Sequence, residues 1–218
     1  MVDLWQICGE EDRLPSDLAL SDALMAVGYQ KLTLQDGRLS CSESDVRIDL
    51  GGIGKGAAIG LLLEHLEKSG ADGGVISFGS NVAVFGEKPS GDPFRIAIRD
   101  PKDGSATVGT LLLKPGQILS VSGDYERYVT IGGERYHHIL DPKTGYPADT
   151  GLSSVAVITS DGALADALST ALFVMGEDAA MELYRNESFD FEAIFIGSDG
   201  ALHCTEGLSD CFIRGAQS

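Results

Sequence analysis

The sequence has no apolar run approaching the 18 or more residues that a membrane-spanning helix requires. It is also poor in basic residues, because 16 Lys and Arg stand against 33 Asp and Glu, for a formal net charge of -17. That charge argues against a nucleic-acid partner, since phosphate backbones are bound by clustered Lys and Arg. A small phosphate-bearing ligand stays compatible, because backbone N–H groups, a metal and one or two local cations can hold it.

Cysteine pairs of the CxxC type are also missing, which argues against a zinc knuckle. The four cysteines are scattered along the chain: Cys8, Cys41, Cys204 and Cys211. Cys204 and Cys211 could pair in an exported protein, whereas scattered thiols are more often reduced. The first fifteen residues, MVDLWQICGEEDRLP, show no basic segment followed by an apolar one, so we expect no signal peptide there. The compartment is left open.

Apolar residues make up 43% of the 218 residues, enough for a sizeable core in one large domain or two small ones. Their periodicity predicts helices at residues 16–29, 55–70, 161–176 and 176–186, the first with Ser16 as its N-cap and the second ended by Gly70. The intervening pattern predicts many strands, including Val46–Leu50 and a hairpin turning at Asp36-Gly37. Strands in hairpins with helices set apart favour an α+β fold with a largely antiparallel sheet and flanking helices. No repeat or linker is visible, so we expect one domain over residues 1–218.

The stretch RYHHILDPKTGYPA, Arg135 to Ala148, places two adjacent histidines before an Asp-Pro turn. Its start alternates like a strand, and Asp-Pro ends it because proline cannot donate to a strand ladder. In a strand, His138 and Leu140 share one face while His137 lies on the other, so we do not expect the two histidines to chelate one metal together. A polar pair at a strand end is the plainer alternative when these residues are taken alone.

The segment DLGGIGKGAAIG, Asp49 to Gly60, predicts the end of a strand, a glycine turn and the start of a helix. Glycines allow a ligand to approach the backbone, and a helix N-terminus has unpaired N–H groups and partial positive charge, which suits a phosphate. It is not a Walker A loop, because Gly56 rather than Ser or Thr follows Lys55, and it lacks the G-x-G-x-x-G spacing. An ordinary tight turn is the alternative.

In ADALSTALF, Asp166 and Thr170 are four residues apart on a predicted helix and therefore share a face. A carboxylate and a hydroxyl are hard oxygen ligands suited to Mg²⁺, which otherwise keeps waters or substrate phosphates. Such a pair is also common on amphipathic helices, where the threonine bonds back to the preceding turn. A third segment, SVSGDYERY from Ser120 to Tyr128, is compatible with ordinary turn chemistry.

Six segments occur in the order and character of the ApbE-type FAD:protein FMN transferases, namely DLGGIGKG, SFGSNV, FRIAIRDP, SGDYERY, HHILDPKTGYPA and ADALSTALFVMG. The chain resembles that family from VDLW near its start to about residue 176. The resemblance implies an ApbE-like (T-fold-like) domain, shortened at the N-terminus relative to a typical member. It also implies a Mg²⁺-dependent enzyme whose substrate is FAD and whose partner is an acceptor flavoprotein. Such an enzyme splits the FAD pyrophosphate, releases AMP and leaves FMN on a threonine or serine hydroxyl.

The resemblance also implies residue roles. It puts FAD contacts at Asp49, Lys55 and the backbone of Leu140. It puts the Mg²⁺ ligands at the carbonyl group of Gly52 and the side chains of Asp166 and Thr170.

His138 matches the single histidine of shorter H-x-x-D-P versions, and the resemblance therefore implies that it is the catalytic base. An imidazole can take a hydroxyl proton while Mg²⁺ stabilises charge on the phosphoryl oxygens. Two alternatives stay open: Mg²⁺-dependent hydrolysis of FAD to FMN and AMP, and a flavin-binding or partner-binding protein without turnover.

Overall fold

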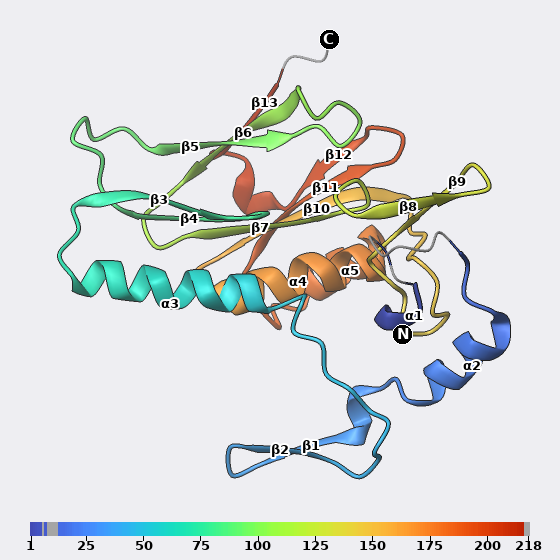
Figure 1. The fold of residues 1–218 in the computed structure, drawn as a ribbon. Coiled ribbons are helices and arrows are strands. Elements are labelled where there is room, and N and C mark those ends of the chain that lie inside the picture. Colours follow the sequence, from blue (N-terminus) through green and yellow to red (C-terminus); the bar gives the residue numbers. More distant parts are fainter. Residues whose placement is uncertain (6, 8–12, 216–218) are drawn as a thin grey trace. The chain divides into compact units, whose positions relative to one another are not determined.

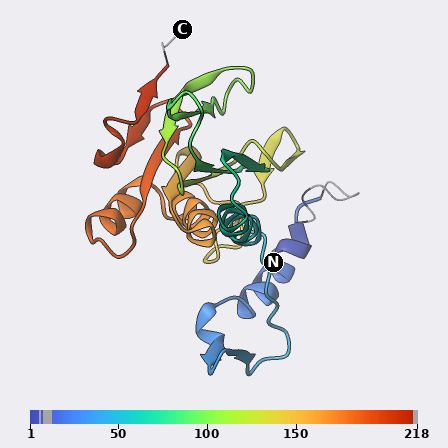
Figure 2. The same cartoon turned by 90° about the vertical axis from the view of Figure 1, so that its left-hand side faces the viewer.

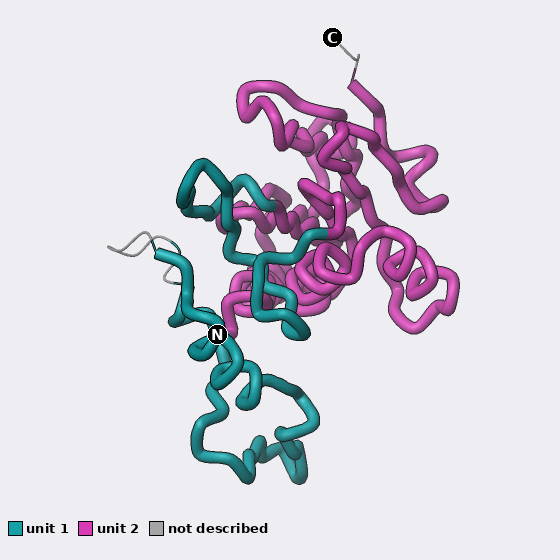
Figure 3. Tube along the Cα trace, turned by 90° about the vertical axis from the view of Figure 1, so that its right-hand side faces the viewer, with its two compact units in different colours: residues 1–49, 124–149 teal, residues 50–123, 150–218 magenta. Residues whose placement is uncertain are grey.

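The computed structural model describes residues 1–5, 7 and 13–215. Cys8 therefore lies outside the described residues. The chain forms two compact units, coloured separately in Figure 3. Unit 1 comprises Met1–Asp49 and Asp124–Asp149, and unit 2 comprises Leu50–Gly123 and Thr150–Ser218. That residues 1–218 form a single domain is still a prediction, and the two units are described separately below.

Unit 2 is built on a six-stranded sheet with the order β12-β11-β10-β7-β4-β3, in which all neighbours are antiparallel. Its strands are β3 (Gly73–Phe78), β4 (Asn81–Gly86), β7 (Ile118–Gly123), β10 (Leu152–Thr159), β11 (Glu192–Gly197) and β12 (Leu202–Cys204). A second, three-stranded antiparallel sheet has the order β13-β6-β5. Its strands are β5 (Phe94–Arg99), β6 (Thr107–Leu113) and β13 (Phe212–Arg214).

The two faces of the six-stranded sheet pack against different layers, which Figure 1 shows from the side. On one face lie the helices α3 (Gly54–Lys68) and α4 (Gly162–Met175), and the short helices α5 (Glu177–Arg185) and η2 (Glu206–Leu208) follow in the chain. Strand β4 shows the alternation that separates the layers, since Val84 packs with Phe94 of the smaller sheet while Phe85 packs with Ile59 of α3. The predicted α+β fold with a largely antiparallel sheet is confirmed.

Helices α3 and α4 lie side by side, as the view along them in Figure 2 shows. They approach closely at two glycines, because a Cβ atom added to Gly56 would lie only 1.9 Å from the carbonyl oxygen of Gly162. Asp161 is the N-cap of helix α4, and its side chain accepts a hydrogen bond from Leu164 N at 3.1 Å. Helix α3 ends just before Gly70, whose φ of +76° confirms the predicted glycine stop.

Unit 1 combines short helices with two hairpins. Its elements are α1 (Val2–Trp5), α2 (Asp17–Met25), η1 (Tyr29–Lys31), β1 (Leu32–Gln35), β2 (Arg38–Cys41), β8 (Tyr128–Ile131) and β9 (Glu134–His137). The predicted serine cap of α2 is confirmed, since Ser16 Oγ accepts from Ala19 N at 3.3 Å. The predicted turn between β1 and β2 is also confirmed, with positive φ at Asp36 and Gly37.

One strand prediction is wrong, and another extends beyond the observed strand. Val46–Leu50 forms no strand, and Ile48 and Leu50 are exposed rather than paired into a sheet. The predicted histidine strand is present only as far as His137, which pairs with Tyr128, the first residue of β8, although the His138 N–H still donates to the carbonyl oxygen of Arg127 at 3.1 Å. His138 and Leu140 therefore lie outside β9, so the strand periodicity behind their predicted shared face does not apply to them.

Two short elements, α1 and β13, were not predicted from the sequence. No helix in the described ranges combines the length and apolar character needed to cross a membrane.

Candidate active site

Asp166 is the centre of a buried polar cluster in unit 2. Its side chain comes from α4 and is only 3% exposed. Oδ2 accepts a hydrogen bond from the backbone N–H of Gly56 at 2.9 Å, in the first turn of α3. Oδ1 lies 3.1 Å from Lys55 Nζ and 3.3 Å from Ser120 Oγ. The close approach of the two helices thus places a carboxylate at the positive end of α3, which stabilises both groups.

Hydroxyl groups from β7 and α4 extend this cluster. Ser120 and Ser122 are two residues apart on β7 and therefore face α4 together. Ser169 Oγ lies 3.2 Å from Ser120 Oγ and 2.9 Å from Ser122 Oγ, and Ser122 Oγ lies 3.0 Å from Thr170 Oγ1. The alternating S-V-S pattern is a signal for this face, but it does not identify the helix that the strand contacts.

Asn81, the first residue of β4, closes the inner end of the cluster. It is fully buried, and its Oδ1 accepts from Ser120 Oγ at 3.1 Å. Its Nδ2 has no hydrogen-bond partner among the residues that the structure describes. Asn81, Ser120 and Ser169 were not predicted as site residues from the sequence, because their contacts join elements that are distant along the chain.

The three residues that the family resemblance gives as metal ligands, Gly52, Asp166 and Thr170, lie near one another in unit 2. A Cβ atom added to Gly52 would lie 3.9 Å from Thr170 Oγ1, and Thr170 Oγ1 donates to the backbone oxygen of Asp166 at 3.4 Å. One carboxylate with neutral oxygens fits Mg²⁺, which usually takes one or two carboxylates and leaves positions for water and phosphate. Within the described ranges, no group of three or more His, Cys, Asp or Glu forms a metal cluster. The donor set therefore fits a hard cation that shares its ligands with a substrate.

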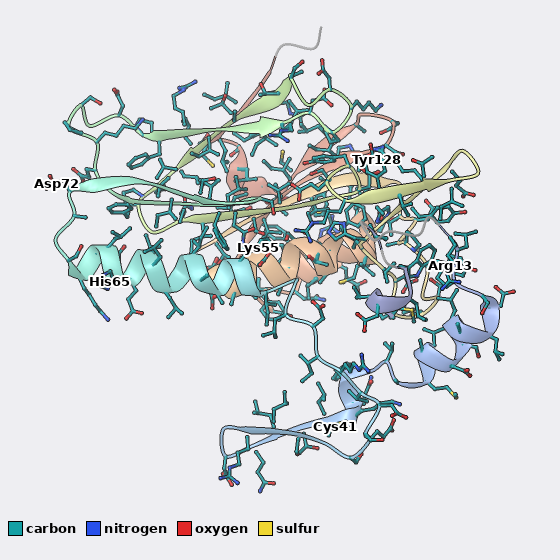
Figure 4. The ribbon with its side chains drawn as sticks, viewed as in Figure 1. Arg13, Cys41, Lys55, His65, Asp72 and Tyr128 are labelled. Carbon is teal, nitrogen blue, oxygen red and sulfur yellow. The ribbon has the colours of Figure 1, made fainter. Side chains whose placement is uncertain are left out.

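Lys55 points into this cluster rather than only toward solvent (Figure 4). Its Nζ reaches Asp166 and also donates to the carbonyl oxygen of Gly51 at 3.2 Å. The helix start predicted to bind phosphate therefore already has one N–H, that of Gly56, directed to Asp166. Asp49 is exposed, and it belongs with Leu140 to unit 1. Their FAD contacts stay predictions.

The two adjacent histidines have different hydrogen bonds within unit 1. His138 Nδ1 lies 3.2 Å from the carbonyl oxygen of Arg127. Because a carbonyl can only accept, Nδ1 carries the proton, and Nε2 of the neutral ring carries a lone pair. His137 Nε2 donates to the carbonyl of Ala148 at 3.1 Å, while its Nδ1 accepts from Ile139 N at 3.3 Å. Burial lowers the pKa of His137. The hydrogen bonds of His137 thus join it to Ile139 and Ala148 in the segment that follows, and His138 has the tautomer that a general base requires.

Trp5 anchors the loop that follows the histidines. It is buried, and its Nε1 donates to the carbonyl oxygen of Gly145 at 2.7 Å. Its ring centroid lies 5.5 Å from those of both Tyr136 and Tyr146. A single tryptophan in the sequence indicates a packing site, but the sequence does not show that its partner is Gly145, 140 residues away.

The chain belongs to the ApbE family, whose profile matches residues 1–195. It is 40% identical over 184 residues to the FAD:protein FMN transferase of Rhodobacter capsulatus, covering 82% of this chain and 34% of that protein. It is 34% identical over 190 residues to the FAD:protein FMN transferase of Haemophilus influenzae, covering 84% of this chain and 55% of that protein. The family resemblance found in the sequence is confirmed.

Solved structures agree with this assignment. The ApbE protein of Thermotoga maritima matches with a TM-score of 0.86 and 35% identity, covering 96% of this chain and 69% of that chain. The apo form of the flavinyl transferase ApbE of Pseudomonas stutzeri matches with a TM-score of 0.82 and 32% identity, covering 99% and 67%. The chain spans between 34% and 55% of the length of the two curated relatives described above.

Proposed function

We propose that this chain catalyses Mg²⁺-dependent transfer of FMN from FAD to a threonine or serine hydroxyl of an acceptor flavoprotein, with release of AMP. The observation that carries the proposal is the buried carboxylate of Asp166, which contacts the Ser120 hydroxyl, the Lys55 ammonium group and the backbone N–H of Gly56, at the start of a helix that follows a glycine turn. The relatives named FAD:protein FMN transferase support the same reaction.

In this proposal, Asp166, Thr170 and the carbonyl group of Gly52 hold the metal, and the metal supplies stabilisation of negative charge on the phosphoryl oxygens. Ser120 and the N–H of Gly56 keep the Asp166 carboxylate in one orientation through their hydrogen bonds. Gly52 has no side chain, which allows its carbonyl group to approach a ligand closely.

His138 is the proposed base. Its Nε2 takes the proton of the acceptor hydroxyl as that oxygen forms a bond to the phosphorus of the FMN moiety. The pyrophosphate bond to the AMP moiety breaks, and AMP leaves with the bonding electron pair. The Nδ1–H group keeps its hydrogen bond to the Arg127 carbonyl, so the ring holds its orientation in both protonation states. Asp49, Lys55 and Leu140 are the proposed contacts to FAD.

Incubation of the protein with FAD, Mg²⁺ and a flavoprotein of known target threonine tests the proposal. Transfer gives a fluorescent acceptor band on a denaturing gel together with one AMP per FMN attached. The same acceptor with its target threonine changed to alanine is the matched control and should give no band. AMP and free FMN without a labelled acceptor would establish hydrolysis instead, and no turnover of FAD would refute both enzymatic functions.

A further inference from the structure

The ion pair between Lys55 and Asp166 lies among the oxygen atoms that the proposed function assigns to a metal. Lys55 Nζ contacts both carboxylate oxygens, at 3.1 and 3.4 Å. The Asp166 side chain is only 3% exposed, whereas the Lys55 side chain is 34% exposed. One partner is therefore fixed in the interior, and the other reaches it from the surface.

A buried carboxylate needs a compensating positive charge, because removing it from water is costly. Across the described part of the chain, Lys55 is the single cationic side chain within ion-pair distance of Asp166. The other side-chain and backbone donors to its carboxylate, Ser120 Oγ and Gly56 N–H, are neutral. Lys55 thus provides the charge compensation at Asp166.

The lysine ammonium group and a divalent cation would compete for the same oxygens. Besides Asp166, Lys55 Nζ binds the carbonyl oxygen of Gly51, directly before the proposed metal ligand Gly52. Two positive charges on one carboxylate repel each other, most strongly where water is excluded. The Lys55 stem passes the β3–β4 turn, since a Cβ on Gly79 would lie 3.6 Å from Lys55 Cδ. The head group can therefore leave while the stem stays in place.

We propose that Lys55 is an exchangeable counter-ion of Asp166: a divalent cation that binds at Asp166 displaces the Lys55 ammonium group, which then becomes available to an anionic phosphate of the nucleotide. This inference rests on the proposed function, because it needs the metal site there. It assigns Lys55 two successive anionic partners, and it makes metal binding favour nucleotide binding through one side chain.

Amine acylation of the protein without substitutions, followed by peptide mass spectrometry, tests the exchange directly. Mg²⁺ alone should raise the rate of Lys55 modification by about threefold or more, as expected when a partly buried ion pair opens. Lys68 is the internal control, because it lies on the same helix in an exposed pair with Glu64, and its rate should not change. Equal Lys55 rates with and without bound Mg²⁺ would overturn the exchange.

Calorimetric titration with Mg²⁺ gives a second measurement. Lys55→Met keeps the aliphatic stem and removes the competing charge, so its Kd for Mg²⁺ should fall roughly three- to tenfold. Lys68→Met, the matched control, should bind like the unmodified protein. Mg²⁺ binding that is absent, or that Asp166→Asn leaves unchanged, would refute the metal site of the proposed function as well. Binding with unaltered Lys55 labelling would refute the exchange alone. If Lys55→Met does not fold, the labelling result decides.

Discussion

Replacing Gly56 by alanine tests how tightly the helix crossing holds the site. The added Cβ would lie 1.9 Å from the carbonyl oxygen of Gly162 and 2.6 Å from Asp166 Cβ, far inside van der Waals contact. Overpacking of this kind costs about 1–3 kcal/mol, and backbone is the obstacle here, so we expect the upper end. Moving the helices apart also stretches the buried bond from Gly56 N–H to Asp166, worth about 1–3 kcal/mol if left unmade.

These two costs outweigh the gain of roughly 0.5–1 kcal/mol from removing a glycine within a helix. Gly56→Ala should therefore lower the free energy of unfolding by roughly 3 kcal/mol or more. Gly54→Ala is the matched control on the same helix, because no atom of the described residues lies within 4 Å of its added Cβ. It should leave stability within about 0.5 kcal/mol, or raise it slightly.

Urea unfolding followed by far-UV circular dichroism measures both variants. This signal reports on all the helices, of which α3 and α4 are the longest, whereas fluorescence of the single tryptophan, Trp5, reports on unit 1. Equal unfolding midpoints for the Gly56 and Gly54 variants, at unchanged m-values, would refute the close helix approach and the position it gives Asp166.

Three further predictions concern the titratable residues. His138→Ala should lower the rate of FMN transfer at saturating FAD by roughly 10²–10⁴, the usual effect of losing a general base. His137→Ala should lower the free energy of unfolding and keep most of the transfer rate. Equal rate losses would contradict these roles. Asp166→Asn should keep the fold but remove activity together with its Mg²⁺ dependence, and unchanged turnover at limiting Mg²⁺ would contradict the metal assignment. Because burial lowers the pKa of folded His137, protonation favours unfolding, and stability should fall as the pH drops below about 6.5. Urea midpoints across this pH range should vary less in His137→Gln, and an equal variation would exclude His137 as the source.

The long helices and the hairpins were predictable because their signals are local. Asp166 and Thr170 mark one face of α4 through their spacing alone. Glycines with positive φ stop α3 and turn the hairpins, as the sequence indicated. The Asp166–Thr170 pair was also predictable as a pair, because four residues make one turn.

Strand ends were less predictable, because a strand exists only where a neighbour pairs with it. Val46–Leu50 has the apolar alternation of a strand, but no strand in the described residues pairs with it. His138 continues the pattern of β9, yet β8 ends the ladder at Tyr128. The difference between the two histidines therefore comes from their hydrogen bonds to Arg127 and Ala148, and strand periodicity could not reveal it.

The glycine-rich segment shows why its chemistry could not be read from composition. A ligand-binding turn and a close helix crossing both require a missing side chain, so the same letters fit either role. The atoms that an added Cβ would meet distinguish the two roles. Among the described residues, it would meet the Gly162 backbone and Asp166 Cβ at Gly56, the Thr170 hydroxyl alone at Gly52, and no atom within 4 Å at Gly54. Gly56 is therefore the position at which the two helices approach most closely, and Gly52 is the position that faces the proposed metal site. The close approach at Gly56 brings Lys55 to Asp166, which is 111 residues away in the sequence, so the ion pair follows from the packing of α3 against α4.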